Sequence, residues 1–546
     1  MTMADRSTNE SKNTHAEGNG SCGDGIRVQE TNNMDQKQQI IQEMTYELRK
    51  SHDLIMEQMM DLFNEFINRE ESPKGVDILN DPSKYRNRKK ADRRGVLMEK
   101  EFLPRNSLLT DLFEIKHIKT IYHIFMAILI LLFVNAVVCD FAEYGKLDFG
   151  LDLIFWNFNE LRTVLMFWVG MMTSTLLLYS CFSNWANGRI SLQKNKFTLK
   201  LWDYGCLLAL VVYMVAFLYI PCTMLMARDI PPASSAIILM EQVRLLMKSH
   251  AFVRSNAPRA LRVTEGKDEV KDHTVCPGFS KFLYFLFVPT LVYRDTYPST
   301  KQIRWKVVAW HFIEIAEIIF YGSFLFGHFL MPQYRKFGLE PLTVGTLTAN
   351  IFRSMMPSML VFLCGFYLLL HAWMNAFAEM MQFSDRMFYK DWWTSSTFAT
   401  YYRTWNVVVH DWLYTYIYKD VAEFLAPPAD EGTMPISYTR SRLIPQLMVF
   451  AISALFHEYI ITFCLRFFYP VLLIIFGIFG VILVFLTKYE GVCGNIFMWI
   501  AICSGNGVVF SLYIMEWYAR KHCPLQVEPK WDFYVPRSWY CSRLEY

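Results

Sequence analysis

One histidine of this 546-residue chain lies in the middle of an apolar run, where an ionisable side chain is costly and therefore marks a candidate site. His457 is followed by Glu458 in the segment MVFAISALFHEYIITF, residues 448–463. A neutral imidazole inside a membrane protein can act as a general base, because its unperturbed pKa lies near neutrality. The alternative is a histidine that only hydrogen-bonds a neighbouring helix.

Two aromatic segments upstream carry the other polar groups suited to chemistry. They are FYKDWW, residues 388–393, and YYRTWNVVVHDW, residues 401–412. Asn406 and His410 are four residues apart and share one face if the segment is helical. The Asn406 carboxamide can donate to an oxyanion. Arg403 suits phosphate, and aromatic rings can stack on adenine. On composition alone, both segments also fit aromatic stretches at a membrane interface.

Motifs of other site chemistries are missing from the sequence. It contains no P-loop, GxSxG, HExxH, CxxC pair or GxGxxG fingerprint. We therefore expect no metal site and no resident cofactor. Nothing in the sequence indicates nucleic acid as a partner.

The elements that must position these residues are membrane helices. Hydrophobic residues make up 53% of the chain and charged residues only 19%, which excludes an ordinary soluble or disordered protein. A bilayer core of about 30 Å requires about 20 apolar residues per helix. Eight windows meet this requirement: 121–139, 163–182, 204–226, 307–333, 354–378, 443–465, 467–487 and 495–515.

The distribution of basic residues predicts a ninth span. Basic residues between 84 and 94 precede the first window, so the N-terminus is expected in the cytosol. Three crossings would then leave residues 254–271, which are rich in Arg and Lys, on the wrong side. A helix over 234–254 repairs this. Its charged residues, Glu241, Arg244 and Lys248, share one face, which should point at protein or water. The fold class is thus an all-α polytopic membrane protein of about nine helices, with a lumenal C-terminus.

Outside the spans, we expect a disordered cytosolic tail at 1–35 and a basic cytosolic linker at 71–117. Residues 36–70 predict an amphipathic helix, which either rests on the membrane or self-associates. The membrane domain covers 118–518 and a lumenal tail covers 519–546. Most of the 12 cysteines lie in spans, but Cys523 and Cys541 both fall in that tail. An oxidising lumen favours a disulfide between them, and two free thiols are the alternative.

The polar and aromatic motifs together resemble those of the membrane-bound O-acyltransferases, and more closely those of the sterol O-acyltransferases. The resemblance rests on FYKDWW, YYRTWNVVVHDW and FHEY, and it extends from about residue 105 to the end. Two departures are visible: Thr394 replaces the Asn that usually follows FYxDWW, and 426–437 is an insertion. Further matching stretches are 284–300, 375–389, 516–524 and 536–541.

The resemblance implies a fold with a catalytic chamber inside the membrane, in the endoplasmic reticulum, and transfer of a fatty acyl group from acyl-CoA to a sterol hydroxyl. His457 would be the base and Asn406 would hold the thioester carbonyl or oxyanion, without an acyl-enzyme. The family motif residues are Phe388, Tyr389, Asp391, Trp392 and Trp393. The residues expected at acyl-CoA are Tyr402, Arg403, Trp405, His410, Tyr418, Arg442 and Ser453.

Other substrates and another class of protein remain open at this point. Within the superfamily, the acceptor can be diacylglycerol, a fatty alcohol or retinol instead of cholesterol. Nine spans with intramembrane carboxylates would also suit a transporter, although no internal repeat is evident. The expected partners are long-chain acyl-CoA, a sterol, the bilayer and a second copy of the chain, as a dimer or tetramer formed through the N-terminal helix.

Overall fold

The computed structural model describes residues 99–145, 149–264, 276–340, 343–425, 440–488 and 491–541. All of them belong to one compact unit, Ser83–Tyr546. The expectations for 1–35, 36–70 and the insertion 426–437, and most of the linker 71–117, lie outside the described residues.

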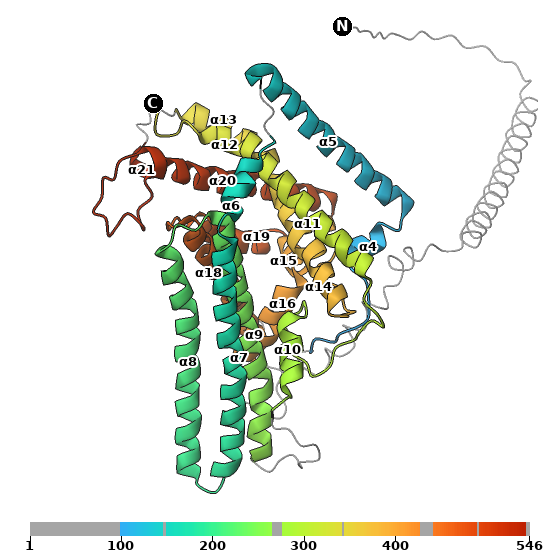
Figure 1. Ribbon diagram of the computed structural model, residues 1–546, viewed down its shortest axis with the longest axis vertical. Coiled ribbons are helices and arrows are strands. Elements are labelled where there is room, and N and C mark those ends of the chain that lie inside the picture. Colours follow the sequence, from blue (N-terminus) through green and yellow to red (C-terminus); the bar gives the residue numbers. More distant parts are fainter. Residues whose placement is uncertain are drawn as a thin grey trace, which may run out of the picture. The chain divides into compact units, whose positions relative to one another are not determined.

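Secondary structure in the described residues is helical, apart from three isolated β-bridges, which confirms the predicted fold class (Figure 1). Short π-helical segments interrupt several of the longer helices. The elements up to residue 340 are α4 (Leu108–Leu112), α5 (Lys116–Tyr144), α6 (Leu151–Phe158), α7 (Leu161–Leu192), α8 (Lys196–Met226), α9 (Pro232–Thr264), α10 (Phe279–Phe287), α11 (Trp305–Leu325), η2 (Phe326–Leu330) and α12 (Met331–Tyr334).

The second half of the chain carries the predicted site segments on several short elements and on the long helix α18 (Arg440–Leu465). They follow α13 (Val344–Phe366), η3 (Tyr367–Trp373) and α14 (Met374–Met380), and they precede the long helix α20 (Val492–His522). The elements between them are η4 (Trp392–Thr394), α15 (Phe398–Trp405), α16 (Val407–Leu413), η5 (Tyr414–Tyr418), α17 (Lys419–Phe424), α18 (Arg440–Leu465), η7 (Leu473–Phe479) and α19 (Gly480–Leu486); α21 (Ser538–Cys541) follows α20.

Seven helical runs in the described residues are long and apolar enough to cross a membrane, so the chain is a multi-pass membrane protein. They coincide with seven of the eight predicted windows. The runs are Lys116–Glu143, Leu151–Leu192, Lys196–Met226, Trp305–Tyr334, Val344–Met380, Leu443–Leu465 and Val492–His522.

The window at 467–487 does not form the predicted long helix. Its apolar helical run, Leu473–Leu486, is in the shorter class of 10–17 residues. The chain leaves α18 through Arg466, whose φ of 66° lies in the left-handed region, and Phe467–Pro470 are not helical. Apolarity alone therefore overestimated the length of this helix, because the break depends on local backbone geometry.

The 234–254 segment lies within α9, a continuous helix of 33 residues that is not among the seven most apolar runs. Its charges contact protein, as predicted for their shared face. Arg244 pairs with Glu241 at 2.6 Å, and Glu241 also accepts from the Trp168 indole. Lys248 donates to the carbonyls of Phe285, Leu286 and Val288 at the end of α10. These contacts stabilise charges that lipid could not solvate.

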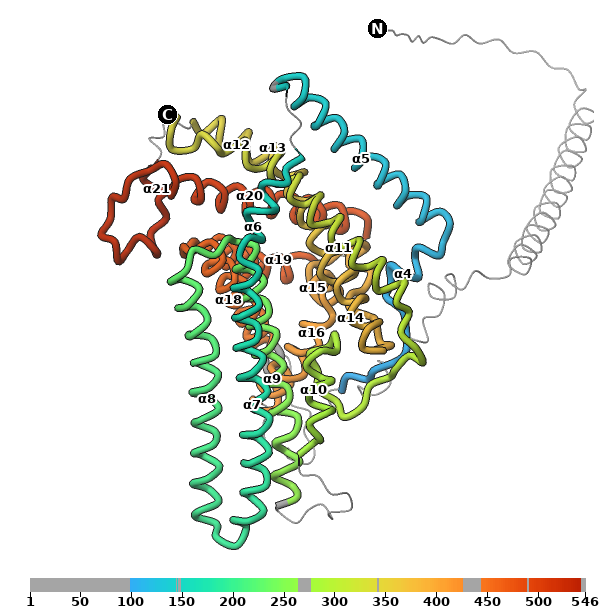
Figure 2. The backbone as a smooth tube through the Cα atoms, viewed as in Figure 1, coloured from blue at the N-terminus to red at the C-terminus, as the bar shows by residue number. Residues whose placement is uncertain are grey.

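Helices α7, α8 and α9 lie side by side (Figure 1). The tube in Figure 2 shows the tight connection between α7 and α8, where Asn195 caps α8 by accepting from two backbone N–H groups. Pro221 in α8 cannot donate to the carbonyl of Phe217, and Gln242 of α9 donates to that carbonyl instead, at 2.7 Å. Helix α9 in turn packs against α18, which carries His457.

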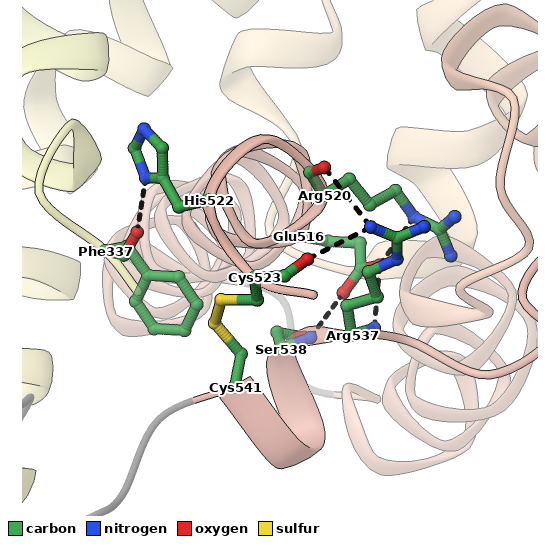
Figure 3. The surroundings of a disulfide bond; sticks show 8 residues. All are labelled: Phe337, Glu516, Arg520, His522, Cys523, Arg537, Ser538 and Cys541. Atoms are coloured by element: carbon green, nitrogen blue, oxygen red, sulfur yellow. Dashed lines mark hydrogen bonds and ion pairs between the residues drawn. A yellow bond between two sulfur atoms is a disulfide. The ribbon is translucent and has the colours of Figure 1, made fainter. Parts of the chain in front are cut away.

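The C-terminal tail folds onto the end of α20 (Figure 3). Cys523 and Cys541 form a disulfide, with Cα atoms 5.7 Å apart. Arg537 donates to the carbonyl of Cys523 and forms an ion pair with Asp532 at 2.7 Å. The hydrogen bond from Arg537, together with the charge of Arg520, holds the pKa of the Asp532 carboxyl below its ordinary value, despite partial burial. The tail is thus fixed by a covalent link and by ion pairs.

Candidate active site

The histidine predicted to be the base lies on α18, with one ring nitrogen already engaged. His457 Nδ1 is 2.7 Å from the carbonyl oxygen of Ser453, one turn earlier. A carbonyl can only accept, so Nδ1 carries the proton and Nε2 of the neutral ring has the free lone pair. The side chain is exposed although α18 packs against α9, η5 and η7. His457 therefore presents Nε2, its unprotonated nitrogen, as the candidate base.

The neighbouring carboxylate, Glu458, has a different partner. It is 4% exposed and accepts from the backbone N–H of Leu473 at 2.9 Å, from Thr462 and from the Tyr513 hydroxyl. Leu473 begins η7, so Glu458 satisfies a backbone donor at a helix start. Glu458 anchors the next helix and does not orient His457.

Asn406 lies at the junction of α15 and α16 rather than within a helix. Its backbone is extended, with φ −134° and ψ 90°, and its side-chain oxygen caps α16 by accepting from Val409 N–H at 3.1 Å. The cap fixes the direction of the carboxamide. Its NH₂ group has no hydrogen-bond partner among the described residues, so it can donate to a ligand oxygen.

The FYKDWW segment holds Asn406 in place through the backbone. Val407 N–H donates to the carbonyl of Phe388 at 2.9 Å, and Lys390 N–H donates to the carbonyl of Thr404 at 2.8 Å. These two bonds bracket Asn406. Sequence reasoning missed this positioning role, since only the tertiary structure brings the two segments together.

Most of the aromatic side chains of the FYKDWW motif are buried, and Trp392 packs against rings of α15. Phe388, Tyr389 and Trp392 are each 1% exposed. Trp405, expected at acyl-CoA, stacks on Phe362 at 4.6 Å and meets Trp392 edge-on. Asp391 and Thr394 are exposed, and Trp393 is half-buried. The Thr394 hydroxyl donates to the carbonyl of Asp391 at 2.7 Å, so the departure from the family Asn keeps a hydrogen bond in this turn.

Aromatic rings connect the YYRTWN segment to the helix that carries His457. Tyr402 meets Phe476 at 5.3 Å between ring centroids, and Phe476 meets His457 at 5.2 Å. Tyr402 also contacts Phe450 of α18. One ring therefore separates a residue of the YYRTWN segment from the candidate base, although the two lie far apart in the sequence.

The other residues expected at acyl-CoA lie on α15, α16, η5 and α18. Arg403 is exposed on α15, and its Nε donates to the Ala399 carbonyl at 2.9 Å. His410 lies on α16 and Tyr418 on η5, which packs against α18. Ser453 contributes its carbonyl to His457, and Arg442 is in the first turn of α18.

A second buried polar cluster was not predicted. His371 of η3 is 3% exposed, and its Nδ1 is 2.7 Å from the Tyr389 hydroxyl, which also contacts Ser107 at 2.8 Å. Nearby, Glu314 pairs with His311 at 2.8 Å. His371 lies inside an apolar window, so the rule that identified His457 also applies to it. Across the described ranges, no three His, Cys, Asp or Glu side chains are grouped to hold a metal ion.

The close approach of Tyr402 to Gly480 leads to a prediction. A Cβ atom at Gly480 would lie 2.6 Å from the Tyr402 hydroxyl oxygen, so Gly480→Ala must displace that ring. If Tyr402 contacts acyl-CoA, losing one contact of about 1 kcal/mol raises KM for acyl-CoA about fivefold. Steady-state kinetics in microsomes measure this. Gly505→Ala is the matched control, because its Cβ would meet Ile475 at an ordinary 4.0 Å. An unchanged KM would remove Tyr402 from the acyl-CoA site.

Comparison with known proteins completes the description of the site. The model of the MBOAT, membrane-bound O-acyltransferase family, matches residues 212–515, a range that includes both Asn406 and His457. The chain is 41% identical to sterol O-acyltransferase 1 of Mus musculus over 445 residues, 81% of this chain and 79% of that protein. It is 40% identical to sterol O-acyltransferase 2 of Homo sapiens over 446 residues, 81% of this chain and 80% of that protein.

Proposed function

The chain belongs to the sterol O-acyltransferases of the membrane-bound O-acyltransferase family, and we propose that it transfers a long-chain fatty acyl group from acyl-CoA to the 3β-hydroxyl of a sterol such as cholesterol. The products are a sterol ester and free CoA. One observation supports this most directly. The Ser453 carbonyl holds the proton on Nδ1 of His457, which leaves Nε2 as a base.

The proposed reaction is a direct transfer between two bound substrates. His457 Nε2 accepts the proton of the sterol hydroxyl as its oxygen attacks the thioester carbonyl carbon. The carbonyl oxygen becomes an oxyanion, which accepts a hydrogen bond from the Asn406 carboxamide. Collapse of this intermediate breaks the carbon–sulfur bond, and the imidazolium returns its proton to the departing CoA thiolate. Acyl-CoA is thus a co-substrate, and no resident cofactor is proposed.

Charge and apolarity give the substrates different routes to this site. CoA is charged and water-soluble, so it must enter from the aqueous side. We assign Arg403, which is exposed, to its phosphates, and we assign Tyr402, Trp405, His410, Tyr418, Arg442 and Ser453 to the rest of acyl-CoA. The acyl chain and the sterol can enter through the bilayer.

The topology that we propose places this chemistry in the endoplasmic reticulum membrane. The N-terminus faces the cytosol, because basic residues precede the first span. The C-terminus then faces the lumen, whose oxidising conditions suit the Cys523–Cys541 disulfide.

A substrate comparison tests the proposed function. Microsomes that contain the protein receive labelled oleoyl-CoA with either cholesterol or diacylglycerol, and the labelled ester is identified by chromatography. We expect cholesteryl oleate. Triacylglycerol as the main product would assign the chain to the diacylglycerol reaction instead. No ester with any hydroxyl acceptor would favour a transporter.

We further propose that residues 36–70 support a homo-oligomer. Deletion of residues 1–70 should lower the mass of the assembly while acyl transfer persists, because both proposed catalytic residues follow Phe388 and symmetric oligomers bury self-complementary faces. Light scattering in detergent compares full-length and truncated protein. An unchanged mass would reject self-association and favour a helix on the membrane surface. Loss of activity in a folded truncation would show that assembly supports the site.

A further inference from the structure

The first described residues form an extended segment that crosses the loops beside the proposed site. We call residues 99–107 the N-terminal strap. Arg105 and Asp385 form a β-bridge, in which Arg105 N–H donates to Ser384 and Arg386 N–H donates to Arg105. The side chains add an ion pair, with Arg105 Nε 2.6 Å from Asp385 Oδ1. The strap is therefore fixed directly to the loop that leads into FYKDWW.

The strap also reaches α16, the helix that Asn406 caps. Lys100 Nζ lies 2.6 Å from Asp411 Oδ2, and the two side chains are only 15% and 12% exposed. Lys100, Asp411, Phe388 and Val407 line the same small cavity. This ion pair thus lies beside the backbone bond from Val407 to Phe388 that holds Asn406.

Lys100 is one of two groups that keep Asp411 ionised. Burial by itself raises the pKa of the Asp411 carboxyl, but the neighbouring His410 side chain, 3.6 Å away, and the charge of Lys100 together bring it below its ordinary value. Asp411 is therefore a carboxylate at neutral pH. A buried carboxylate that loses its partner must recruit water or a proton, which disrupts the local packing.

Asp411 lies near the start of a helical run in which α16 continues without a break into η5 and α17. The first N–H groups of a helix have no partner within it, so its first turns depend on a cap and on tertiary contacts. Asn406 provides the cap, and the Lys100–Asp411 pair fixes the following turn. Movement of α16 would therefore move the Asn406 carboxamide.

We propose that Lys100 is a positioning residue of the acyl-transfer site, which holds α16 and the Asn406 carboxamide in place through Asp411. This inference rests on the proposed function, in which Asn406 stabilises the oxyanion. In this proposal Lys100 acts through Asp411 and not on a substrate. Its effect should therefore appear mainly in kcat, since a displaced Asn406 fails chiefly when negative charge develops.

Kinetics of full-length variants in microsomes test the proposal. Lys100→Met should lower kcat about tenfold to a hundredfold, the usual range for a displaced catalytic group, with a smaller change in KM for acyl-CoA. Lys100→Arg should keep most of the activity, because it keeps the charge. Lys336→Met is the matched control: Lys336 also pairs with a carboxylate, Glu340, at 2.9 Å, but both side chains are exposed. This control should match wild type.

A double variant tests whether Lys100 acts through Asp411. Lys100→Met combined with Asp411→Asn should be no slower than Lys100→Met alone, because two changes to one contact are not additive. Independent, multiplied losses would overturn the proposal. So would wild-type kcat in Lys100→Met, or a Lys100→Arg variant as slow as Lys100→Met.

Hydrogen exchange provides a readout that does not require activity. Backbone amides of 407–413 should exchange faster in Lys100→Met than in wild type or Lys336→Met, and unchanged exchange would overturn the proposal. If wild type esterifies no sterol, the proposed function fails, whereas the exchange measurement still tests the ion pair. If Lys100→Met does not purify as a folded protein, the double variant carries the same test, because it removes the same ion pair without leaving the Asp411 charge unpaired.

Discussion

Replacing His457 with alanine is expected to lower acyl transfer about 10²–10⁴-fold, the usual contribution of a positioned general base, while expression and membrane insertion remain intact. The reason is the geometry of the ring. The Ser453 carbonyl fixes the proton on Nδ1, so Nε2 is the nitrogen that can remove the sterol hydroxyl proton. Alanine leaves the backbone of α18 unchanged and removes only this base. Esterification of labelled oleate in microsomes measures the effect.

A second histidine provides the control for this variant. His522 Nδ1 also lies 2.7 Å from a backbone carbonyl, that of Phe337, but it is at the end of α20 beside the disulfide. His522→Ala should therefore retain turnover. Residual activity above about a tenth of wild type in His457→Ala would exclude His457 as the base, because it falls short of the smallest contribution expected of one.

Replacing Asn406 with alanine is expected to reduce kcat about 10²–10³-fold, the usual cost of one lost oxyanion donor. Binding of acyl-CoA should change little, since the donor acts mainly as negative charge develops. Alanine also removes the cap of α16, so the Asn406→Ala variant combines two effects. Asn406→Asp separates them: the carboxylate still accepts from Val409 N–H but has no NH₂ group to donate. The Asn406→Asp variant should lose as much kcat as Asn406→Ala.

The capping effect by itself is measured at another helix. Asn195 caps α8 through its side-chain oxygen, so Asn195→Ala removes a comparable cap away from the proposed catalytic residues. This variant should lose some stability and keep its kcat. An active Asn406→Asp variant would argue against a donor role. A rise in KM at unchanged kcat in Asn406→Ala would make Asn406 a binding residue instead.

The sequence predicted the position of His457 more fully than that of Asn406. His457 was predicted because an ionisable pair, His457 and Glu458, is costly in an apolar run, and its ring is oriented by a carbonyl only four residues away. The sequence placed Asn406 and His410 on one helical face, yet the structure makes Asn406 an N-cap. That outcome depends on the bonds from Val407 to Phe388 and from Lys390 to Thr404. Such pairing between distant segments leaves no periodic signal in the sequence.

The sequence by itself determined the membrane class, seven of the long apolar helices, and the family to which the chain belongs. Apolarity, helix length and motif identity are local properties, and they can be read without knowing which segments meet. Only the tertiary structure decided that Glu458 anchors η7, that the helix after α18 is short, and that Lys100 reaches Asp411. The reason is physical. A buried polar group must be satisfied by whichever partner the fold brings within hydrogen-bonding distance, and that partner is set by packing rather than by neighbours along the chain.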